Sequence, residues 1–302
     1  MANKKREKIV VVVGPTSSGK SDLAVLIAKK FNGEVISADS RQVYKGLDIG
    51  TGKITKREMK GVKHHLLDVV SPKKVFTVVD FKEKAEKAIE NIAKGGKIPI
   101  VAGGTGFYIQ ALIDDINFPP VKANKTLRDA LRKKSIKELH EELSKLDPDR
   151  AENIDSKNKV RLIRAIEIAK SVGRVPKISK NNNYDVLIIG IEVDPKKLRE
   201  RIKARLKKRI KVGMVKEARN LHERGLTYKR MEELGLEYRY LALFLKGEIS
   251  KEEMFDRLET KIWQYSKRQN TWFRKDKRII WLSLSKTREI EKVVEKFLRI
   301  DK

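Results

Sequence analysis

The sequence has 302 residues, enough for one large domain or two modest ones. Lys and Arg outnumber Asp and Glu by 70 to 41, and the resulting net charge of +29 indicates a polyanionic partner such as a nucleic acid. The absence of cysteine excludes disulfides, thiolate zinc sites, iron–sulfur clusters and cysteine nucleophiles. No apolar run approaches the ~20 residues of a membrane helix, so we expect a cytoplasmic protein that does not interact with membranes.

The first part of the chain alternates short β-branched runs with helical patterns. The expected strands are residues 8–13, 34–38 and 98–102, and helices are expected from residue 20 onward and over 81–93. Strands that alternate with helices predict an α/β fold, with a parallel sheet covered by helices on both faces.

The second part begins with a basic, helical segment. Residues 126–146 and 160–171 have helical patterns, and they lie between Pro119-Pro120 and the asparagine run at 181–183. A buried strand is expected over 184–193, helices from 195 to about residue 272, and a last strand over 278–284. We therefore predict a catalytic core of residues 1–120 and 185–302 and a helical insertion of residues 121–184.

A phosphate-binding loop follows the first expected strand. The sequence GPTSSGKS fits the pattern G-x-x-x-x-G-K-[ST] and lies between a strand and a helix, as that motif requires. Backbone N–H groups of such a loop surround phosphate oxygens, the lysine adds a charge, and the last hydroxyl can ligate Mg²⁺. The predicted diphosphate-binding residues are Gly14, Pro15, Thr16, Ser17, Ser18, Gly19, Lys20 and Ser21.

The acidic residue that most P-loop NTPases place on the magnesium ion is missing from its usual position. The strand over 98–102 runs into Gly103 instead of an aspartate. Asp39, at the end of the second expected strand, is the nearest carboxylate. From the residues alone its role is open between a helix cap and a ligand of magnesium-bound water.

Five separate blocks carry a resemblance to a known family. They are GPTSSGKS (14–21), SADSRQVYKGLDIGTGK (37–53), HHLLD (64–68), VAGGTGFYIQAL (101–112) and KRQNTWFR (267–274). In this order they resemble the tRNA dimethylallyltransferases, also called tRNA isopentenyltransferases, of the bacterial type without a zinc finger. The resemblance implies a P-loop NTPase-like fold, a Mg²⁺ cofactor and transfer of a dimethylallyl group from dimethylallyl diphosphate to tRNA. The acceptor would be the exocyclic amine of the adenosine 3′ of the anticodon, and diphosphate would leave.

The resemblance also implies roles for individual residues. Asp39 matches the general base, Ser21 the hydroxyl at the metal, Lys20 the diphosphate lysine and Arg205 an arginine on the diphosphate. The positions matching tRNA contacts are Asp39, Ser40, Arg41, Gln42, Thr105, Arg128, Asn158, Lys159, Val160, Arg161, Leu162, Lys267, Arg268, Gln269 and Arg274.

For several other residues we expect structural roles or no assigned contact. We expect Trp272 and Phe273 in the core, and His64 and His65 in structural roles, because adjacent histidines are a poor geometry for one metal. The segment 235–239 departs from the family's shorter glycine-tyrosine pattern, so the resemblance assigns it no contact.

The sequence leaves three alternative functions open. An adenylate dimethylallyltransferase would use the same donor with a free nucleotide as acceptor. A P-loop small-molecule kinase would use the arginines of 199–211 as a lid over ATP, and a non-enzymatic RNA-binding protein would need only the charge. The net charge and the basic insertion favour an RNA acceptor, the anticodon stem-loop of tRNA, and we expect a monomer.

Overall fold

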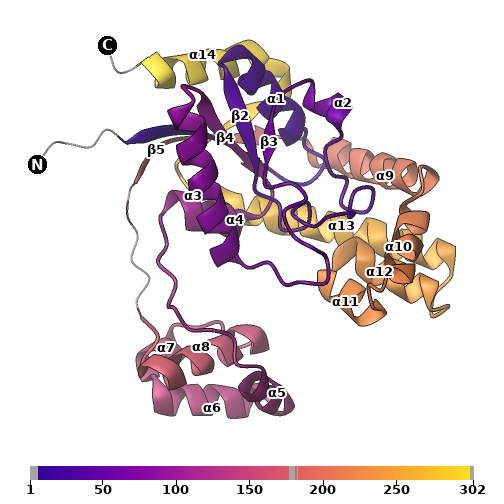
Figure 1. Cartoon of the computed structure of the whole chain (residues 1–302). Coiled ribbons are helices and arrows are strands. Elements are labelled where there is room, and N and C mark those ends of the chain that lie inside the picture. Colours follow the sequence, from indigo (N-terminus) through magenta and orange to yellow (C-terminus); the bar gives the residue numbers. More distant parts are fainter. Residues whose placement is uncertain (1–5, 177–180, 182, 300–302) are drawn as a thin grey trace, which may run out of the picture. The chain divides into compact units, whose positions relative to one another are not determined.

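A parallel β-sheet forms the centre of the larger part of the chain (Figure 1). The computed structural model describes residues 6–176, 181 and 183–299. Within these residues the sheet has six strands in the order β3-β2-β4-β1-β5-β6, every neighbouring pair being parallel. The strands are β1 (Glu7–Val13), β2 (Gly33–Ser37), β3 (His64–His65), β4 (Ile98–Gly103), β5 (Tyr184–Glu192) and β6 (Ile279–Ser283). The predicted P-loop NTPase-like α/β fold is confirmed.

Strand register brings three loops to one edge of the sheet. Val13 of β1 is paired with Gly103 of β4, and Ser37 of β2 is paired with Ala102 of β4. All three strands therefore end together, and the segments that follow them meet there. These segments are the P-loop after β1, Asp39 after β2 and Gly104 after β4.

Helices cover both faces of the sheet because the inner part of β1 is apolar at every position. Ile9, Val11 and Val13 face a cluster that includes residues of α3 (Val78–Lys94), α4 (Gly106–Ile113), α9 (Pro195–Lys211) and α13 (Lys251–Arg274). Val10 and Val12 face the other cluster, formed with α1 (Lys20–Lys30) and α14 (Thr287–Arg299). A strand buried on both faces has no polar side to alternate with, which explains its continuous β-branched run.

The helical stretch after β5 is divided into five helices. Residues with positive φ separate some of them, as at Gly213 (φ +111°) and Gly235 (φ +76°), where a side chain would be strained. These helices are α9, α10 (Met214–Glu223), α11 (Tyr228–Leu234), α12 (Leu236–Leu245) and α13. The remaining short elements of this part are α2 (Lys56–Met59) and the 3-10 turn η1 (Leu284–Lys286). Among the described residues, no helix has both the length and the apolar character that crossing a bilayer requires.

Residues 116–181 form a second compact unit, and residues 1–115 with 182–302 form the first. The smaller unit has its own apolar core around Leu131, Leu139, Leu143 and Ile166. Its helices are α5 (Lys125–Lys133), α6 (Ile136–Leu146), α7 (Pro148–Glu152) and α8 (Lys159–Val172). The contact of this unit with tRNA stays a prediction.

Candidate active site

A pocket opens at the edge of the sheet where β1, β2 and β4 end. The P-loop, the segments after β2 and β4, the loop before α2, and helices α9 and α13 all contribute to it. Its lining residues are Thr16, Ser17, Lys20, Ser21, Val35, Ser37, Asp39, Gln42, Thr51, Ile54, His64, Ala102, Gly103, Gly104, Arg205, Tyr265 and Gln269. The pocket thus brings together the predicted residues Lys20, Ser21, Asp39 and Arg205.

The P-loop has the geometry of an anion cradle. Helix α1 begins at Lys20, directly after Gly19 (φ +96°), so the free N–H groups of its first turn lie at the pocket. The Lys20 ammonium donates to the carbonyl of Pro15 (2.7 Å). Within the described residues the buried Ser18 hydroxyl has no hydrogen-bond partner. The loop is therefore built around polar groups that a bound anion can satisfy.

Gln269 ties the P-loop to the segment after β4. Its amide oxygen accepts from the N–H of Thr16 (2.8 Å), and its amide nitrogen donates to the carbonyl of Gly104 (2.9 Å). A Cβ at Gly104 would lie 2.2 Å from this amide nitrogen, so a larger residue there would displace the Gln269 amide. This contact joins the glycine-rich block after β4 and the KRQNTWFR block in the folded chain. The predicted contact of Gln269 with tRNA stays a prediction; in the structure its amide holds two parts of the pocket wall together.

Trp272 and Phe273 occupy different environments at the end of α13. Phe273 is buried, as expected, but Trp272 is 40% exposed, so its predicted core position is wrong. The Trp272 indole packs against Gly106, where a Cβ would lie only 2.3 Å from its ring. Consecutive residues of a helix point in different directions, and only Phe273 lies on the face that packs on the sheet.

Asp39 lies in a tight turn at the end of β2. Its Oδ1 accepts from the N–H groups of Arg41 (2.8 Å) and Gln42 (3.3 Å). The second oxygen, Oδ2, accepts no hydrogen bond from the residues that the structure describes. Asp39 therefore stabilises its own turn with one oxygen while the other remains available for chemistry in the pocket.

Tyr265 is a pocket residue that the sequence analysis missed. Its phenol lies close to the Thr105 hydroxyl, which accepts from the N–H of Ser40 (3.0 Å). Burial and the nearby Asp39 carboxylate raise the pKa of Tyr265 to about 12, so the phenol stays protonated. Tyr265 lies one helical turn before Gln269, and this i, i+4 spacing was the available signal.

Positive charge is concentrated at the P-loop side of the pocket. Burial lowers the pKa of Lys20 to about 8, Asp39 opposes this shift, and Arg205 adds to it. Nη2 of Arg205 donates to the carbonyl of Gly52 (2.8 Å). The positive charges of Lys20 and Arg205 repel each other in the pocket. A multiply charged anion would relieve this repulsion, so the pocket is suited to bind one.

His64 and His65 differ in their surroundings. The His65 ring hydrogen-bonds with the buried Glu34 carboxylate (2.6 Å), a structural role. His64 lines the pocket, with Nδ1 2.9 Å from the Val62 carbonyl, and burial lowers its pKa below the usual value. His64 is therefore a neutral, polar part of the wall.

Three other predicted tRNA-contact residues lie on α13. Lys267 and Arg268 are exposed, over the rings of Trp263 and Tyr265 respectively. Arg274 pairs with Glu192 (3.0 Å) and stacks on Trp281 at 4.1 Å from the ring centroid. Lys267 and Arg268 are the two whose charges are not held by an acidic partner among the described residues.

The remaining predicted tRNA-contact residues belong to the smaller unit. Asn158 caps α8 by accepting from the N–H of Arg161 (3.2 Å), and Val160 is 77% exposed. Leu162 is fully buried in the core of the unit, so the predicted contact does not extend to its side chain. Lys159 and Arg161 begin α8.

Arg128 has a partner that the sequence did not reveal. Its guanidinium donates two hydrogen bonds to Glu167, from Nε to Oε1 (2.9 Å) and from Nη2 to Oε2 (2.6 Å). Burial alone would raise the pKa of Glu167, which is 2% exposed, but Arg128, the N–H of Asn124 and Arg164 hold it at about 2. Because the folded pKa is depressed, the stabilisation is present at neutral pH and is lost as the pH falls toward 2.

We therefore expect Arg128→Ala to destabilise the protein by about 1–3 kcal/mol at neutral pH, because it removes two hydrogen bonds from a buried carboxylate. Thermal denaturation measures the effect. Arg132→Ala is the matched control, since its pair with Asp129 is exposed and should contribute little. Equal melting temperatures for the two variants would show that the Arg128 pair has no stabilising role.

The same pocket could hold a hard cation. Ser21 and Asp39 offer a hydroxyl and a carboxylate, the oxygen ligands that Mg²⁺ prefers. The described residues contain no group of three or more His, Asp or Glu that could hold a metal by themselves. Such a site suits Mg²⁺ that completes its coordination with substrate phosphate oxygens and water.

A parallel sheet, a P-loop and a cationic pocket at the strand ends define a P-loop protein that binds a phosphorylated ligand. A model of the IPP transferase family matches residues 42–276. The chain belongs to this family, and the resemblance seen in the sequence is confirmed.

Individual relatives align over nearly the whole chain. The tRNA dimethylallyltransferase 2 of Treponema denticola is 46% identical over 272 residues, which cover 88% of this chain and 91% of the relative. The tRNA dimethylallyltransferase of Anoxybacillus flavithermus is 38% identical over 298 residues, covering 97% and 95%.

Two solved structures are also similar. The full-length tRNA isopentenylpyrophosphate transferase of Bacillus halodurans matches with a TM-score of 0.75 and 36% identity, covering 98% of both chains. A eukaryotic dimethylallyltransferase acting on tRNA matches with a TM-score of 0.83 and 27% identity, covering 97% of this chain and 79% of the other.

Proposed function

We propose that this protein transfers a dimethylallyl group from dimethylallyl diphosphate to the exocyclic amine of the adenosine 3′ of a tRNA anticodon. The observation that carries the proposal is a single pocket that joins a P-loop to Asp39 and Tyr265 in a member of the IPP transferase family. The named relatives are tRNA dimethylallyltransferases, which supports the prenyl donor and the tRNA acceptor over a kinase or an adenylate prenyltransferase.

The proposed reaction forms one bond and breaks one. The amine nitrogen attacks the first carbon of the allylic group as that carbon's bond to the diphosphate oxygen breaks. Diphosphate leaves with the electron pair, and the proton of the amine passes to Asp39. P-loop N–H groups, Lys20 and Arg205 stabilise the charge that develops on the leaving group.

Ser21 would hold Mg²⁺ in this pocket, and substrate phosphate oxygens and water would complete its coordination. Bound there, Mg²⁺ would neutralise charge on the departing diphosphate. Tyr265, protonated and close to Thr105, would form the wall beside Asp39 and orient the acceptor base.

The acceptor adenine must leave the stacked bases of the anticodon loop to reach the pocket. We propose that exposed Lys and Arg side chains bind the RNA phosphates during this step. Lys267 and Arg268 on α13 and the N-terminus of α8 are the proposed phosphate contacts. Arg128 and Arg274 each have an acidic partner, so we expect their charges to contribute less to RNA binding.

The test offers the donor with either an anticodon stem-loop RNA or adenosine monophosphate and measures the mass of each acceptor. We expect only the RNA to gain a dimethylallyl group. Prenylation of the nucleotide without the RNA would contradict the proposal and favour an adenylate dimethylallyltransferase.

The pKa of Lys20 predicts a pH dependence of donor binding. Because Lys20 titrates at about 8, its charge is present below that pH and lost above it. The dissociation constant for dimethylallyl diphosphate should therefore rise as the pH passes through about 8, by up to about tenfold per pH unit.

The control for this experiment is Lys20→Met, which keeps the pocket filled without a titrating group. Titration of the donor itself is the same for both proteins, so the difference between the two curves reports Lys20. If the donor dissociation constants of the two proteins change in parallel with pH, the charge of Lys20 does not contribute to diphosphate binding.

A further inference from the structure

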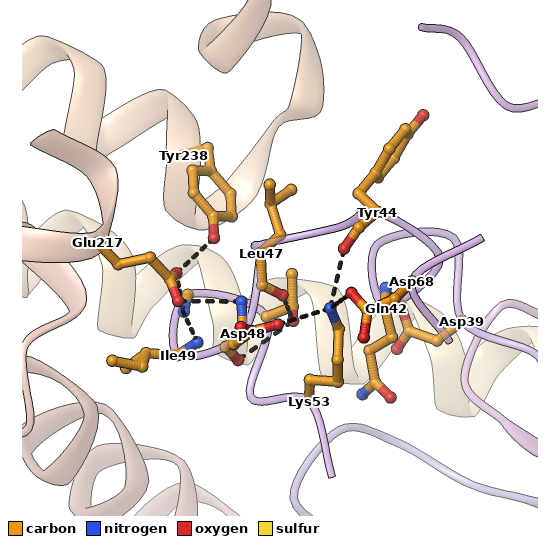
Figure 2. A network of polar contacts seen from close by, with 12 residues as sticks. Asp39, Gln42, Tyr44, Leu47, Asp48, Ile49, Lys53, Asp68, Glu217 and Tyr238 are labelled. Carbon is orange, nitrogen blue, oxygen red and sulfur yellow. Dashed lines mark hydrogen bonds and ion pairs between the residues drawn. The ribbon is translucent and has the colours of Figure 1, made fainter. Parts of the chain in front are cut away.

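Glu217 binds the backbone of a loop next to the pocket. It lies on α10, outside all five sequence blocks, and its carboxylate accepts four hydrogen bonds (Figure 2). Three come from the N–H groups of Asp48 (3.0 Å), Ile49 (2.7 Å) and Gly50 (2.8 Å), and the fourth from the Tyr238 phenol (2.6 Å). One side chain therefore satisfies three successive backbone donors, which fixes the path of the loop.

The far end of the same loop is held by Lys53. Its side chain is 6% exposed, and its ammonium donates to the Tyr44 carbonyl (2.8 Å) and pairs with Asp48 (2.7 Å) and Asp68 (2.5 Å). Figure 2 shows Lys53 and Glu217 on opposite sides of Asp48, which both side chains contact. Residues 47–53 are thus anchored at both ends.

The anchored loop reaches the pocket in two ways. Thr51 lines the pocket directly. The carbonyl of Gly52 accepts from Arg205, the arginine proposed to stabilise the leaving diphosphate. The position of the Arg205 guanidinium therefore depends on the path of the loop.

Two glycines make these contacts possible. A Cβ at Gly50 would lie 2.6 Å from the Tyr238 hydroxyl, and one at Gly52 would lie 2.6 Å from Nη2 of Arg205. Tyr238 comes from the segment 235–239, to which the resemblance assigned no contact, and this packing gives that segment a structural role. Burial and the Glu217 carboxylate raise the pKa of Tyr238, so its phenol remains a donor.

We propose that Glu217 is a positioning residue for the proposed prenyl transfer, holding residues 48–52 so that the Gly52 carbonyl aims Arg205 at the diphosphate of the donor. The inference rests on the proposed function of the pocket. Glu217 itself does not line the pocket, so its effect on the reaction would pass through the loop.

The first experiment measures single-turnover rates at saturating donor and stem-loop RNA for Glu217→Ala and Glu217→Gln. We expect a decrease of about 10- to 100-fold for Ala, because a shift of about 1 Å in a positioned group costs up to about 100-fold. Gln keeps one acceptor oxygen and should be slowed less. Glu223→Gln is the matched control, an exposed glutamate on the same helix, and should turn over normally.

The second experiment separates positioning from general stability through a double-mutant cycle with Arg205→Ala. If Glu217 acts through Arg205, the double variant should be no more than about threefold slower than Arg205→Ala alone. The RNA dissociation constant should be unchanged in every Glu217 variant, because no proposed RNA contact is affected.

The outcomes are distinct. A double variant whose rate falls by the product of the two single decreases would overturn the proposal, as would a wild-type rate in Glu217→Ala. If Glu217→Ala does not fold, the same cycle with Glu217→Gln or Tyr238→Phe tests whether the effect passes through Arg205. Failure of the wild-type protein to prenylate RNA would instead refute the proposed function.

Discussion

Asp39→Asn should bind donor and RNA normally yet turn over about 10²- to 10⁴-fold more slowly, the usual cost of losing a general base. Asparagine keeps an oxygen that can accept from the N–H groups of Arg41 and Gln42, so the turn after β2 should survive. The side chain loses its negative charge and its ability to accept a proton. Single-turnover rates and separate binding curves for donor and RNA measure the two effects.

Two further variants control this experiment. Asp39→Ala removes the turn contacts as well as the base, so it should reduce both turnover and loop stability. Asp22→Asn makes the same chemical change at an exposed position in the first turn of α1 and should have no effect. A normal rate in Asp39→Asn would leave Asp39 with its turn-stabilising role alone.

Arg205→Ala should lower the single-turnover rate by about 10²- to 10³-fold while leaving RNA binding nearly intact. An arginine on a departing diphosphate contributes most where negative charge develops in the transition state. Its guanidinium is held by the Gly52 carbonyl at the pocket that also contains the P-loop, and we therefore assign it to the donor.

Lys267→Ala and Arg268→Ala should give the opposite result. Both side chains are exposed, and each variant should weaken RNA binding and reduce the salt slope of the dissociation constant by about one unit for each RNA phosphate that the side chain neutralises. The measurement is the RNA dissociation constant against salt concentration for all three variants. If Arg205→Ala reduces the salt slope of the RNA dissociation constant and keeps a normal single-turnover rate, Arg205 contacts RNA and not the donor.

The central part of the fold could be predicted because its determinants are local. The apolar run of β1 and the glycine spacing of the P-loop each specify a structure over a few residues. The two-residue strand β3 is too short to have a periodic pattern and was not predicted. The five helices after β5 were predicted as one helical stretch, because the positive-φ residues that separate them interrupt the apolar period only briefly.

The pocket could be predicted in part. Lys20, Ser21, Asp39 and Arg205 lie together, and the motif or the family resemblance had assigned each of them a role. Tyr265 was missed because its i, i+4 spacing from Gln269 indicates a pocket residue only once the packing of α13 against the strand ends is known. Glu217 was missed because its hydrogen bonds join distant parts of the sequence, such as Gly50 and Glu217. Such contacts depend on tertiary structure and leave no local pattern.

The measurement that tests the account most directly is the stoichiometry of diphosphate release in a single turnover. Wild-type protein, Mg²⁺, dimethylallyl diphosphate and stem-loop RNA should yield one diphosphate for each RNA that gains a dimethylallyl group, with added ATP left unconsumed. Consumption of ATP while the mass of the RNA stays unchanged would contradict the account, because the P-loop would then serve a nucleotide and not a prenyl donor.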